Sequence, residues 1–331
     1  MSESYLALVT REQDGKYTTA LQECRLDSLP ESTVLVRVKY SSLNYKDALS
    51  ATGNPGVTRE YPHTPGIDAA GEVVWDRSHH YRAGDPVLVT GHDLGMNTPG
   101  GFAEYICVPV GWVLPLPGQL SLRETMILGT AGFTAALCVE DLRNAGVTPE
   151  QGEILVTGAS GGVGCVAVSI LSGLGYGVVA VTGKEDSHDW LRSLGASRVL
   201  TREELEDNGK ALLRPAWAGA VDTLGGAPLV TVLKSLQYGG AVACCGMAAS
   251  PKLDMTVFPF ILRNVRLLGV DSVEQPRERR QHVWEQLAYH WMPKDPEALL
   301  AAEVSLDQLP PWFERILQGG VRGRVLVHTD R

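Results

Sequence analysis

A glycine-rich turn between an expected strand and an expected helix constrains the fold of this chain more than any other feature. Gly158, Gly161 and Gly164 follow the strand-like run 153–157 and precede the small and apolar residues 165–174. Glycine lets a backbone turn sharply and approach a ligand closely, and the N–H groups at a helix start attract negative charge. In this context the motif predicts a pyrophosphate-binding turn, and an ordinary glycine-rich loop is the disfavoured alternative.

Length and composition are typical of a globular protein. The 331 residues are 44% hydrophobic and 20% charged, which fits two domains of ordinary size. The net charge of −9 argues against nucleic-acid and anionic-membrane partners, which favour basic patches. The sequence shows no charged leader with an apolar core, and the most apolar stretch, 163–181, is interrupted by glycines. We therefore expect no nucleic-acid partner and no membrane association.

The cysteine pattern predicts a reducing compartment. The six cysteines show no C-x-x-C spacing, and most lie in apolar runs, where a free thiol behaves as a small buried hydrophobe. They are Cys24, Cys107, Cys138, Cys165, Cys244 and Cys245. A cytoplasmic location follows as the simplest expectation.

The pattern of strands and helices changes twice along the chain. Residues 1–125 contain short β-type segments broken by Gly and Pro, which predicts a β-rich domain. Residues 126–270 alternate strands with helices, the signature of a doubly wound parallel sheet, or Rossmann fold. Residues 271–331 return to a helix over 277–290 and a closing strand over 324–328, and we expect them to complete the first domain. The predicted fold class is therefore α/β.

Within the nucleotide-binding domain, local signals place the elements that follow the glycine turn. Strands are expected at 176–182, 199–200, 220–224, 241–246 and 265–270. Ser187 is expected to cap a helix that runs to Leu194, with Gly195 as its stop residue. Thr201 and Glu204 fit a capping box. The ligand should lie beyond the carboxyl ends of the strands, near the glycine turn.

The end of the second expected strand favours a phosphorylated dinucleotide. Selectivity for NAD usually needs an acid there, to bind the ribose 2′-hydroxyl. This chain has Thr182, Gly183 and Lys184 instead, and Arg202 follows the third strand as a second cation. These groups suit a 2′-phosphate and predict NADPH rather than NADH. An acidic pair at 185–186 weakens the prediction, and Lys184 as a solvated loop residue is the alternative.

The chain resembles the medium-chain dehydrogenase/reductase superfamily over nearly its whole length. The segments SLNYKD (42–47), PGIDAAG (65–71) and GTAGFTA (129–135) are similar to its zinc-independent quinone-oxidoreductase branch. The segments 158–164, 181–196 and 260–272 are similar to the acrylyl-CoA reductase group of that branch. This resemblance implies a GroES-like β-rich catalytic domain (1–125 and 271–331) and a Rossmann NADPH-binding domain (126–270).

The residues also bear on metal binding. Zinc-bearing relatives use a thiolate, a Gly-His-Glu turn and a four-cysteine lobe, which supply the ligands that tetrahedral Zn²⁺ needs. Here Ile67 and Asp68 stand in the Gly-His-Glu position, and no cysteine lies near Asn44. The histidine pair 79–80 lies in a segment that reads as a solvated loop. We therefore expect no metal.

Without a metal to polarise a carbonyl, reduction of an activated C=C bond becomes the favoured chemistry. The protein then needs a hydrogen-bond donor for the developing enolate oxygen and control of one proton. Tyr45 is the leading candidate, because a phenol is neutral near pH 7 and can donate. It could be the acid or only a positioning group. Asn44 is its neighbour in the motif, and Asp47 and Asp68 are expected to orient local backbone.

Further roles are implied by the resemblance. It places Tyr45 beside nicotinamide and substrate, and Ser160, Gly161, Gly162 and Val163 at the pyrophosphate. It places Thr182, Gly183, Lys184 and Arg202 at the 2′-phosphate. It places Met247, Ile261 and Ser272 on the nicotinamide side, with Arg324 nearby.

Several other residues are open to two interpretations. Arg59, Arg263 and Arg266 could meet the phosphates of a CoA thioester. The basic run 277–280 is expected to be one face of a solvated helix. Three tryptophans (Trp284, Trp291 and Trp312) and two histidines (His63 and His92) are expected to serve packing rather than chemistry.

The favoured function is NADPH-dependent reduction of a short 2-enoyl-CoA thioester, typified by acryloyl-CoA. A quinone or enone/enal reductase is the enzymatic alternative, and a dinucleotide-binding structural or redox-sensing protein is the non-enzymatic one. By resemblance we expect a homodimer that pairs sheet edges through residues 241–246 or 265–270.

Overall fold

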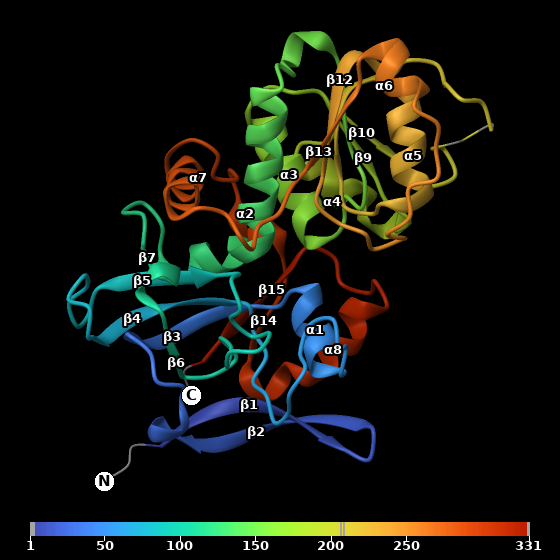
Figure 1. Cartoon of the computed structure of the whole chain (residues 1–331). Coiled ribbons are helices and arrows are strands. Elements are labelled where there is room, and N and C mark those ends of the chain that lie inside the picture. Colours follow the sequence, from blue (N-terminus) through green and yellow to red (C-terminus); the bar gives the residue numbers. More distant parts are fainter. Residues whose placement is uncertain (1–3, 206, 208, 330–331) are drawn as a thin grey trace. The chain divides into compact units, whose positions relative to one another are not determined.

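The computed structural model describes residues 4–205, 207 and 209–329, and its chain forms two compact units (Figure 1). Unit 1 comprises residues 1–130, 273–289 and 299–331, and unit 2 comprises residues 131–272 and 290–298. The predicted boundaries, after residues 125 and 270, lie close to these. Segment 290–298 was expected in the first domain, but the Trp190 indole N–H donates to the Ala298 carbonyl at 2.7 Å and attaches it to unit 2.

Unit 1 is built on β-sheet, as predicted from its short alternating segments. Strands β1 (Ser4–Gln13) and β2 (Lys16–Arg25) form an antiparallel hairpin. A second sheet has the order β14-β15-β3-β4-β5-β7, with β6 also paired to β3. Its strands are β3 (Val34–Ser42), β4 (Asp68–Asp76), β5 (Pro86–Thr90), β6 (Tyr105–Val108), β7 (Leu114–Pro115), β14 (Leu300–Ser305) and β15 (Arg324–His328).

The C-terminal segment completes this sheet because β15 pairs antiparallel with β3, with Leu326 opposite Ser42. Helices α1 (Tyr45–Ala51), α7 (Arg277–Tyr289) and α8 (Pro310–Leu317) belong to the same unit. A core cluster that includes Leu43, Phe102 and Phe313 joins α1, α8 and the sheet. Burial of these apolar side chains fixes the end of β3, from which the candidate catalytic turn begins.

Unit 2 confirms the predicted doubly wound parallel sheet. Its strand order is β10-β9-β8-β11-β12-β13, and each neighbouring pair is parallel. The strands are β8 (Ile154–Val156), β9 (Val178–Val181), β10 (Arg198–Leu200), β11 (Trp217–Asp222), β12 (Leu236–Cys244) and β13 (Arg266–Gly269). The helices are α3 (Gly162–Gly173), α4 (His188–Ser193), α5 (Gly226–Ser235) and α6 (Phe258–Arg263). The order reverses between β8 and β11, and ligands of such sheets bind at that switch point.

One helix, α2 (Leu122–Asn144), is long and apolar enough to cross a membrane by length and composition. However, 83% of its most apolar window is buried inside the protein, which accounts for its hydrophobicity. Its backbone is also broken at Gly129, where φ is 52° and ψ is −155°. The apolar stretch 163–181, noted from the sequence, forms α3 and β9, as expected.

Two predicted helix caps differ from the structure. Ser187 precedes α4, but its hydroxyl donates to Asp186 Oδ1 at 3.1 Å and does not cap the helix. Thr201 and Glu204 form the reciprocal bonds of a capping box, from the Thr201 N–H to Glu204 Oε2 (2.7 Å) and from the Glu204 N–H to Thr201 Oγ1 (3.4 Å). The turn at 203–204 lies within the box itself, and Leu205 after it is in a bend. The motif therefore satisfied local N–H groups without starting a helix.

The basic run at the start of α7 is not a solvated face, contrary to prediction. Arg280 is buried and donates to the carbonyls of Thr90 (2.9 Å) and Val273 (2.6 Å). Arg277 donates to the Val113 carbonyl and to the Tyr81 hydroxyl, at 2.5 and 2.8 Å. These carbonyls come from distant parts of the chain, so charge spacing within the helix could not reveal them.

Candidate active site

The candidate catalytic turn lies where β3 leads into α1. Asn44 is the N-cap of α1 and Tyr45 is its first residue. The Asn44 backbone N–H donates to Asp47 Oδ2 at 2.7 Å, which satisfies a donor just before the helix. Asn44 is 8% exposed and Tyr45 is 46% exposed. The turn thus presents a phenol on a helix start whose neighbouring residues are buried.

Asp47 has the structural role expected of it. Its Oδ1 accepts the backbone N–H of Ile67 at 2.8 Å, so one carboxyl group ties α1 to the segment before β4. Burial, together with the charge of Asp68, raises the pKa of Asp47 to about 7.

The side chain of Asn44 is held from both ends. Its Nδ2 donates to Asp68 Oδ2 at 2.7 Å and to the Ser42 carbonyl at 3.2 Å. Its Oδ1 accepts from Arg324 Nη1 at 3.3 Å. Both hydrogens of the amide nitrogen are therefore used within the protein. This arrangement fixes the side chain of Asn44, whose catalytic role stays a prediction, and the next residue, Tyr45, is exposed.

Asp68 lies at the centre of this network. It begins β4, not a turn as expected, and it is fully buried. Besides Asn44, its carboxylate accepts from Ser42 Oγ (2.6 Å), the Thr130 N–H (2.9 Å) and Thr130 Oγ1 (2.5 Å). Sequence reasoning missed Ser42 and Thr130 as site residues, although both lie in segments that carry the family resemblance.

Arg324, predicted on the nicotinamide side, begins β15 and is 3% exposed. Its Nε donates to the Ile127 carbonyl at 3.0 Å, and its Nη1 donates to the Leu43 carbonyl at 3.2 Å as well as to Asn44. These bonds connect the last strand, α2 and the catalytic turn. That Arg324 contacts a cofactor stays a prediction, whereas its hydrogen bond to Asn44 is present in the structure.

The glycine turn of unit 2 has the shape that a pyrophosphate requires. Gly161 is the N-cap of α3 and brings no side chain to cap it, so the first N–H groups of the helix are available to an anion. At Gly164 a Cβ atom would lie 2.7 Å from the Cα of Ala159. Only glycine permits this close packing of helix start against turn. Gly162 and Val163 form the first turn of α3.

The groups predicted for the 2′-phosphate gather at the ends of β9 and β10. Ser160 Oγ lies 2.8 Å from Thr182 Oγ1, which joins the glycine turn to the end of β9. The Lys184 N–H donates to Thr182 Oγ1 at 3.2 Å. The Arg202 guanidinium lies against Gly183, since a Cβ there would be 2.7 Å from Arg202 Nε. Two cations therefore lie at one end of the sheet.

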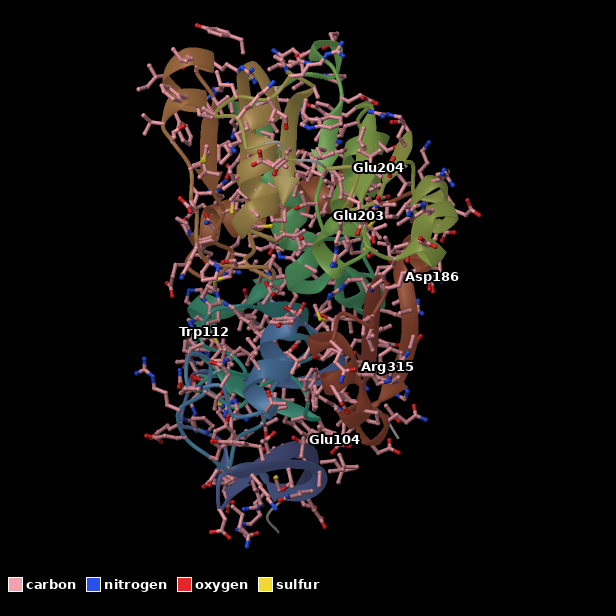
Figure 2. All side chains as sticks on the ribbon, turned by 90° about the vertical axis from the view of Figure 1, so that its right-hand side faces the viewer. Glu104, Trp112, Asp186, Glu203, Glu204 and Arg315 are labelled. Atoms are coloured by element: carbon pink, nitrogen blue, oxygen red, sulfur yellow. The ribbon has the colours of Figure 1, made fainter. Side chains whose placement is uncertain are left out.

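Acidic side chains surround these cations. Asp186 follows Lys184 closely, and Glu203 and Glu204 follow Arg202; all three are exposed at the surface of unit 2 (Figure 2). Their charges oppose an added phosphate, whereas the charges of Lys184 and Arg202 attract one.

Three other residues predicted on the nicotinamide side, Met247, Ile261 and Ser272, belong to unit 2. Met247 follows β12 and is 69% exposed, and Ile261 on α6 is 72% exposed. Ser272 is half-buried at the point where the chain leaves this unit. Exposed apolar side chains of this kind are available to a ligand, and their roles stay predictions.

Two arginines considered for CoA phosphates have structural partners instead. Arg263 donates to the carbonyls of Lys234 (2.8 Å) and Leu236 (3.2 Å). Arg266 donates to the Gly239 carbonyl at 2.7 Å. Arg59 is exposed.

The histidines and tryptophans mostly pack, as expected. His92 stacks on Trp112 with ring centroids 5.2 Å apart, and burial and the charge of Arg280 lower the pKa of His92 to about 4. Burial also lowers the pKa of His63. Trp284 and Trp291 are buried, and Trp312 is partly buried against a core cluster.

One polar group of unit 2 was not predicted. Asp222, at the end of β11, accepts from Thr157 Oγ1 and from the Gly225 N–H, both at 2.7 Å. Burial raises the pKa of Asp222. This buried carboxyl fixes the loop that packs against the glycine turn, where a Cβ on Gly158 would lie 3.3 Å from the Leu224 side chain.

The residues that the structure describes contain no group of three His, Cys, Asp or Glu side chains placed to hold a metal ion. Asp68, at the position of a zinc-ligand turn in metal-bearing relatives, is surrounded by hydroxyl and amide donors. This donor set suits a carboxylate and does not fit a metal, whose ligands must be acceptors.

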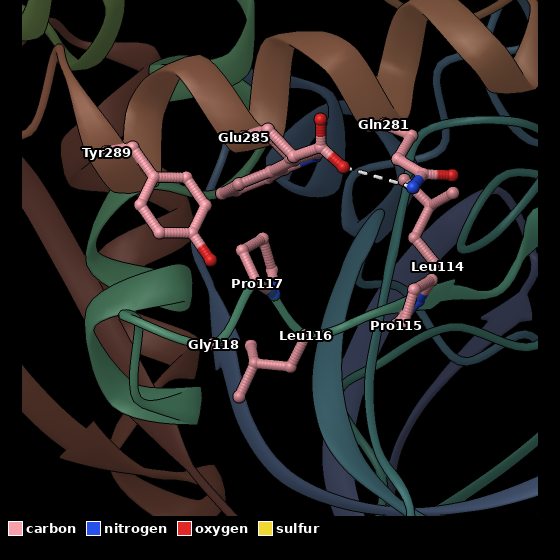
Figure 3. A pocket seen from close by; sticks show the side chains of 9 residues that line it. Leu114, Pro115, Leu116, Pro117, Gly118, Gln281, Glu285 and Tyr289 are labelled. Atoms are coloured by element: carbon pink, nitrogen blue, oxygen red, sulfur yellow. Dashed lines mark hydrogen bonds between the residues drawn. The ribbon is translucent and has the colours of Figure 1, made fainter.

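A cavity of about 180 Å³ in unit 1 holds none of the predicted site residues (Figure 3). It lies between residues 114–118 and the helix α7. Figure 3 shows Tyr289 beside Pro117, while Gln281 Nε2 donates to Glu285 Oε1 at 3.0 Å. We assign it no part in the chemistry.

Two family models match this chain. The alcohol dehydrogenase GroES-like domain matches residues 30–118, and the zinc-binding dehydrogenase domain matches residues 162–289. A GroES-like domain joined to a Rossmann-type domain with a glycine turn defines the medium-chain dehydrogenase/reductases, a class of oxidoreductases.

Full-length relatives narrow the class. The "Probable acrylyl-CoA reductase AcuI" of Escherichia coli is 49% identical over 98% of this chain and 99% of its own length. Acrylyl-CoA reductase AcuI of Ruegeria pomeroyi is 44% identical over 96% of this chain and 97% of its own. The chain therefore belongs to the acrylyl-CoA reductase group of the medium-chain dehydrogenase/reductases, as the sequence resemblance indicated.

Solved structures agree with this assignment. Escherichia coli YhdH with bound NADPH has a TM-score of 0.94 and 48% identity, over 98% of this chain and 100% of that one. Bacillus subtilis YhfP with NAD bound has a TM-score of 0.96 and 44% identity, over 99% and 100%.

Proposed function

We propose that this protein reduces the C=C bond of short 2-enoyl-CoA thioesters with NADPH, typically acryloyl-CoA to propanoyl-CoA. The observation that carries the proposal is full-length similarity, at 44–49% identity, to two AcuI proteins named for this activity. The exposed phenol of Tyr45 on a rigid turn supports it, because the reaction needs one well-placed donor.

The proposed cofactor fits unit 2. The uncapped start of α3 would hold the pyrophosphate, and Thr182, Lys184 and Arg202 would hold the 2′-phosphate. Met247 and Ile261 would cover the nicotinamide side. The NADPH-bound structure of a relative at 48% identity supports this assignment.

When bound, NADPH supplies a hydride for the β-carbon of the unsaturated thioester. Negative charge then develops on the thioester oxygen, and the Tyr45 hydroxyl donates a hydrogen bond to it. The α-carbon takes one proton, so the substrate gains a hydride and a proton overall. Asn44, held by Asp68 and Arg324, keeps Tyr45 at the start of α1 and so fixes the donor before the reaction begins.

A quinone or free enone is the competing substrate class. The Bacillus subtilis relative at 44% identity is provisionally named quinone oxidoreductase YhfP, and its structure holds NAD. Steady-state kinetics with acryloyl-CoA, crotonoyl-CoA, a free enone and a quinone, each with NADPH and NADH, separate the two. We expect the highest kcat/KM for acryloyl-CoA with NADPH. Equal turnover of the free enone would reject the thioester proposal, and NADPH binding without any turnover would favour a structural or sensing role.

We further propose a homodimer that pairs β13 with its copy. Of the two segments named from the sequence, β12 pairs on both sides with β11 and β13, whereas β13 lies at the edge of the sheet. Exposed Leu262 on α6, which packs against β12, provides apolar surface beside that edge. Light scattering should give twice the chain mass of 35.7 kDa; a monomeric mass would reject the proposal.

We also propose that the protein works in the cytoplasm. None of the six cysteines, all of which lie among the described residues, forms a disulfide bond. Burial raises the pKa of the Cys107 thiol, and a hydrogen bond with Cys245, together with burial, raises the pKa of the Cys138 thiol. Free thiols persist in a reducing compartment. Cell fractionation tests this, and recovery from an oxidising compartment would contradict it.

A further inference from the structure

We propose that Asp68 is a positioning residue for the reaction: its carboxylate fixes Asn44 and thereby the direction of the Tyr45 phenol. This inference rests on the proposed function, because it assumes that Tyr45 serves as the donor. It concerns residues of unit 1 alone.

Donors from three segments converge on one buried carboxylate. Asp68 accepts from Ser42 at the end of β3, from Asn44 at the N-cap of α1, and twice from Thr130 in α2. Four hydrogen bonds, from 2.5 to 2.9 Å, fill most of the acceptor capacity of a carboxylate. A single side chain thus joins α2 to the end of β3 and to the turn that leads into Tyr45.

This arrangement also requires an unusual backbone conformation at Gly129. At Gly129 a Cβ atom would lie 2.5 Å from Asp68 Oδ2 and 2.9 Å from Arg324 Nη2. The residue also has a φ of 52°, a left-handed conformation that side chains disfavour. The helix α2 is therefore broken at the place where its N–H and hydroxyl groups reach Asp68. A fold seldom interrupts a buried helix without a compensating contact.

The charges of Asp68 and Arg324 also support this role. A buried carboxylate is costly unless donors or a cation compensate it. Arg324 Nη2 lies near the same glycine, 2.9 Å from the position of an added Cβ. Arg324 Nη1 donates to the side-chain oxygen of Asn44, whose amide nitrogen donates to Asp68. Asn44 therefore lies between a buried anion and a buried cation, which gives its amide one preferred orientation. The backbone of Asn44 leads directly into Tyr45.

An isosteric change tests the role of the charge. In Asp68→Asn the amide nitrogen would meet donors from Ser42, Asn44 or Thr130, so the amide of Asn44 loses its fixed partner. We expect kcat to fall by about 10- to 100-fold, since small displacements of a catalytic group have effects of that size. KM for NADPH should change by less than about 3-fold, because unit 2 holds the cofactor in the proposed scheme.

A matched control lies on the same strand. Asp76 is the last residue of β4, at the opposite end of the strand from Asp68. It accepts hydrogen bonds from the backbone N–H groups of Ser78 (2.7 Å) and His80 (2.8 Å). Asp76→Asn removes the charge of a hydrogen-bonded carboxylate without touching the turn. We expect wild-type kcat from it. An equal loss of kcat in both variants would overturn the positioning role.

A double-mutant cycle identifies the residue through which Asp68 acts. If Asp68 acts through Tyr45, Asp68→Asn should lower kcat much less in a Tyr45→Phe background than in the wild type. A full and additive loss in that background would overturn the proposal, as would a Tyr45→Phe variant with unchanged kcat.

A readout that needs no turnover separates this proposal from the proposed function. Protein labelled with 3-fluorotyrosine gives a ¹⁹F resonance for Tyr45, assigned by its absence in Tyr45→Phe. We expect Asp68→Asn to shift or broaden it, and Asp76→Asn to leave it unchanged. An unmoved resonance in Asp68→Asn would overturn the positioning role whether or not the wild type reduces enoyl-CoA. Absence of enoyl-CoA turnover by the wild type would instead reject only the proposed function.

Two milder substitutions, both at Thr130, keep the proposal testable if Asp68→Asn does not fold. Thr130→Val removes the hydroxyl bond to Asp68 Oδ1 and keeps the backbone N–H bond to Asp68 Oδ2, whereas Thr130→Ser retains both. We expect Thr130→Val to move the Tyr45 resonance in the same direction but less, and Thr130→Ser to restore the wild-type position. The same shift in both variants would contradict the proposal.

Discussion

Arg324 Nη1 donates to Asn44 Oδ1 at 3.3 Å across 280 residues of sequence. This bond joins the first residue of the last strand to the N-cap of the first helix. Since β15 also pairs with β3, the C-terminal segment is part of the candidate catalytic turn and does more than close a sheet. The stability of the site therefore depends on contacts made late in the chain.

Replacing Tyr45 with phenylalanine should lower kcat for acryloyl-CoA by at least about 100-fold, because general acid or hydrogen-bond donation contributes on that scale. The ring is retained and Tyr45 is 46% exposed, so stability should not change. Steady-state kinetics and thermal unfolding of the purified variant measure both. Turnover equal to that of the wild type would exclude a donor role for the phenol.

Replacing Arg202 with alanine should raise KM for NADPH by about 10- to 100-fold, since charged hydrogen bonds contribute about 1.5–3 kcal/mol. KM for NADH should change little, because NADH lacks the 2′-phosphate. Arg192→Ala is a suitable control, since Arg192 on α4 is exposed and pairs with Asp189 at 2.7 Å. Equal effects of Arg202→Ala on both cofactors would show that Arg202 does not contact the phosphate.

The parts of the fold that follow from local pattern could be predicted from the sequence. Alternating strands and helices predicted the parallel sheet, and the turn around Gly161 predicted its ligand-binding end. Both predictions were possible because these signals lie within short stretches of chain. Thr182 and Arg202 could be proposed because each lies just beyond the carboxyl end of a strand, where ligands of such sheets bind.

The polar network could not be predicted in the same way. The donors to Asp68 lie 24 to 62 residues away, and no spacing rule connects them. Arg280 illustrates the same limit, since a run of charges on a helix normally indicates a solvated face. Its burial depends on the Thr90 carbonyl, 190 residues away. Such contacts are set by tertiary packing and not by local propensity.

The titration of Asp47 should make stability fall as pH rises. Burial and the charge of Asp68 raise its pKa from 3.8 in the unfolded chain to about 7 in the folded protein. The folded state therefore binds this proton more tightly, and the resulting stabilisation is complete below pH 4 and lost as pH rises through about 7. The loss is up to about 4 kcal/mol from a shift of this size.

Urea unfolding between pH 5 and 8 measures this effect. The decline of the unfolding free energy with pH should be smaller in Asp47→Asn than in the wild type. Asp76→Asn should keep the wild-type slope, because the pKa of Asp76 is about 2: hydrogen bonds from Ser78 and backbone N–H groups outweigh its desolvation. Identical slopes in wild type and Asp47→Asn would mean that Asp47 does not titrate in this range.

Substituting alanine for Gly129 should destabilise the protein more than the same change at Gly146. Both glycines have positive φ, 52° and 82°, so both variants incur backbone strain of about 1–3 kcal/mol. At Gly146 an added Cβ meets nothing within 4 Å, whereas at Gly129 it would lie 2.5 Å from Asp68 Oδ2. We therefore expect a loss beyond strain only at Gly129, together with reduced kcat because Asp68 must move. Chemical unfolding and steady-state kinetics of the two variants provide the comparison. Equal destabilisation would show that the Asp68 carboxylate moves aside without lowering the free energy of unfolding.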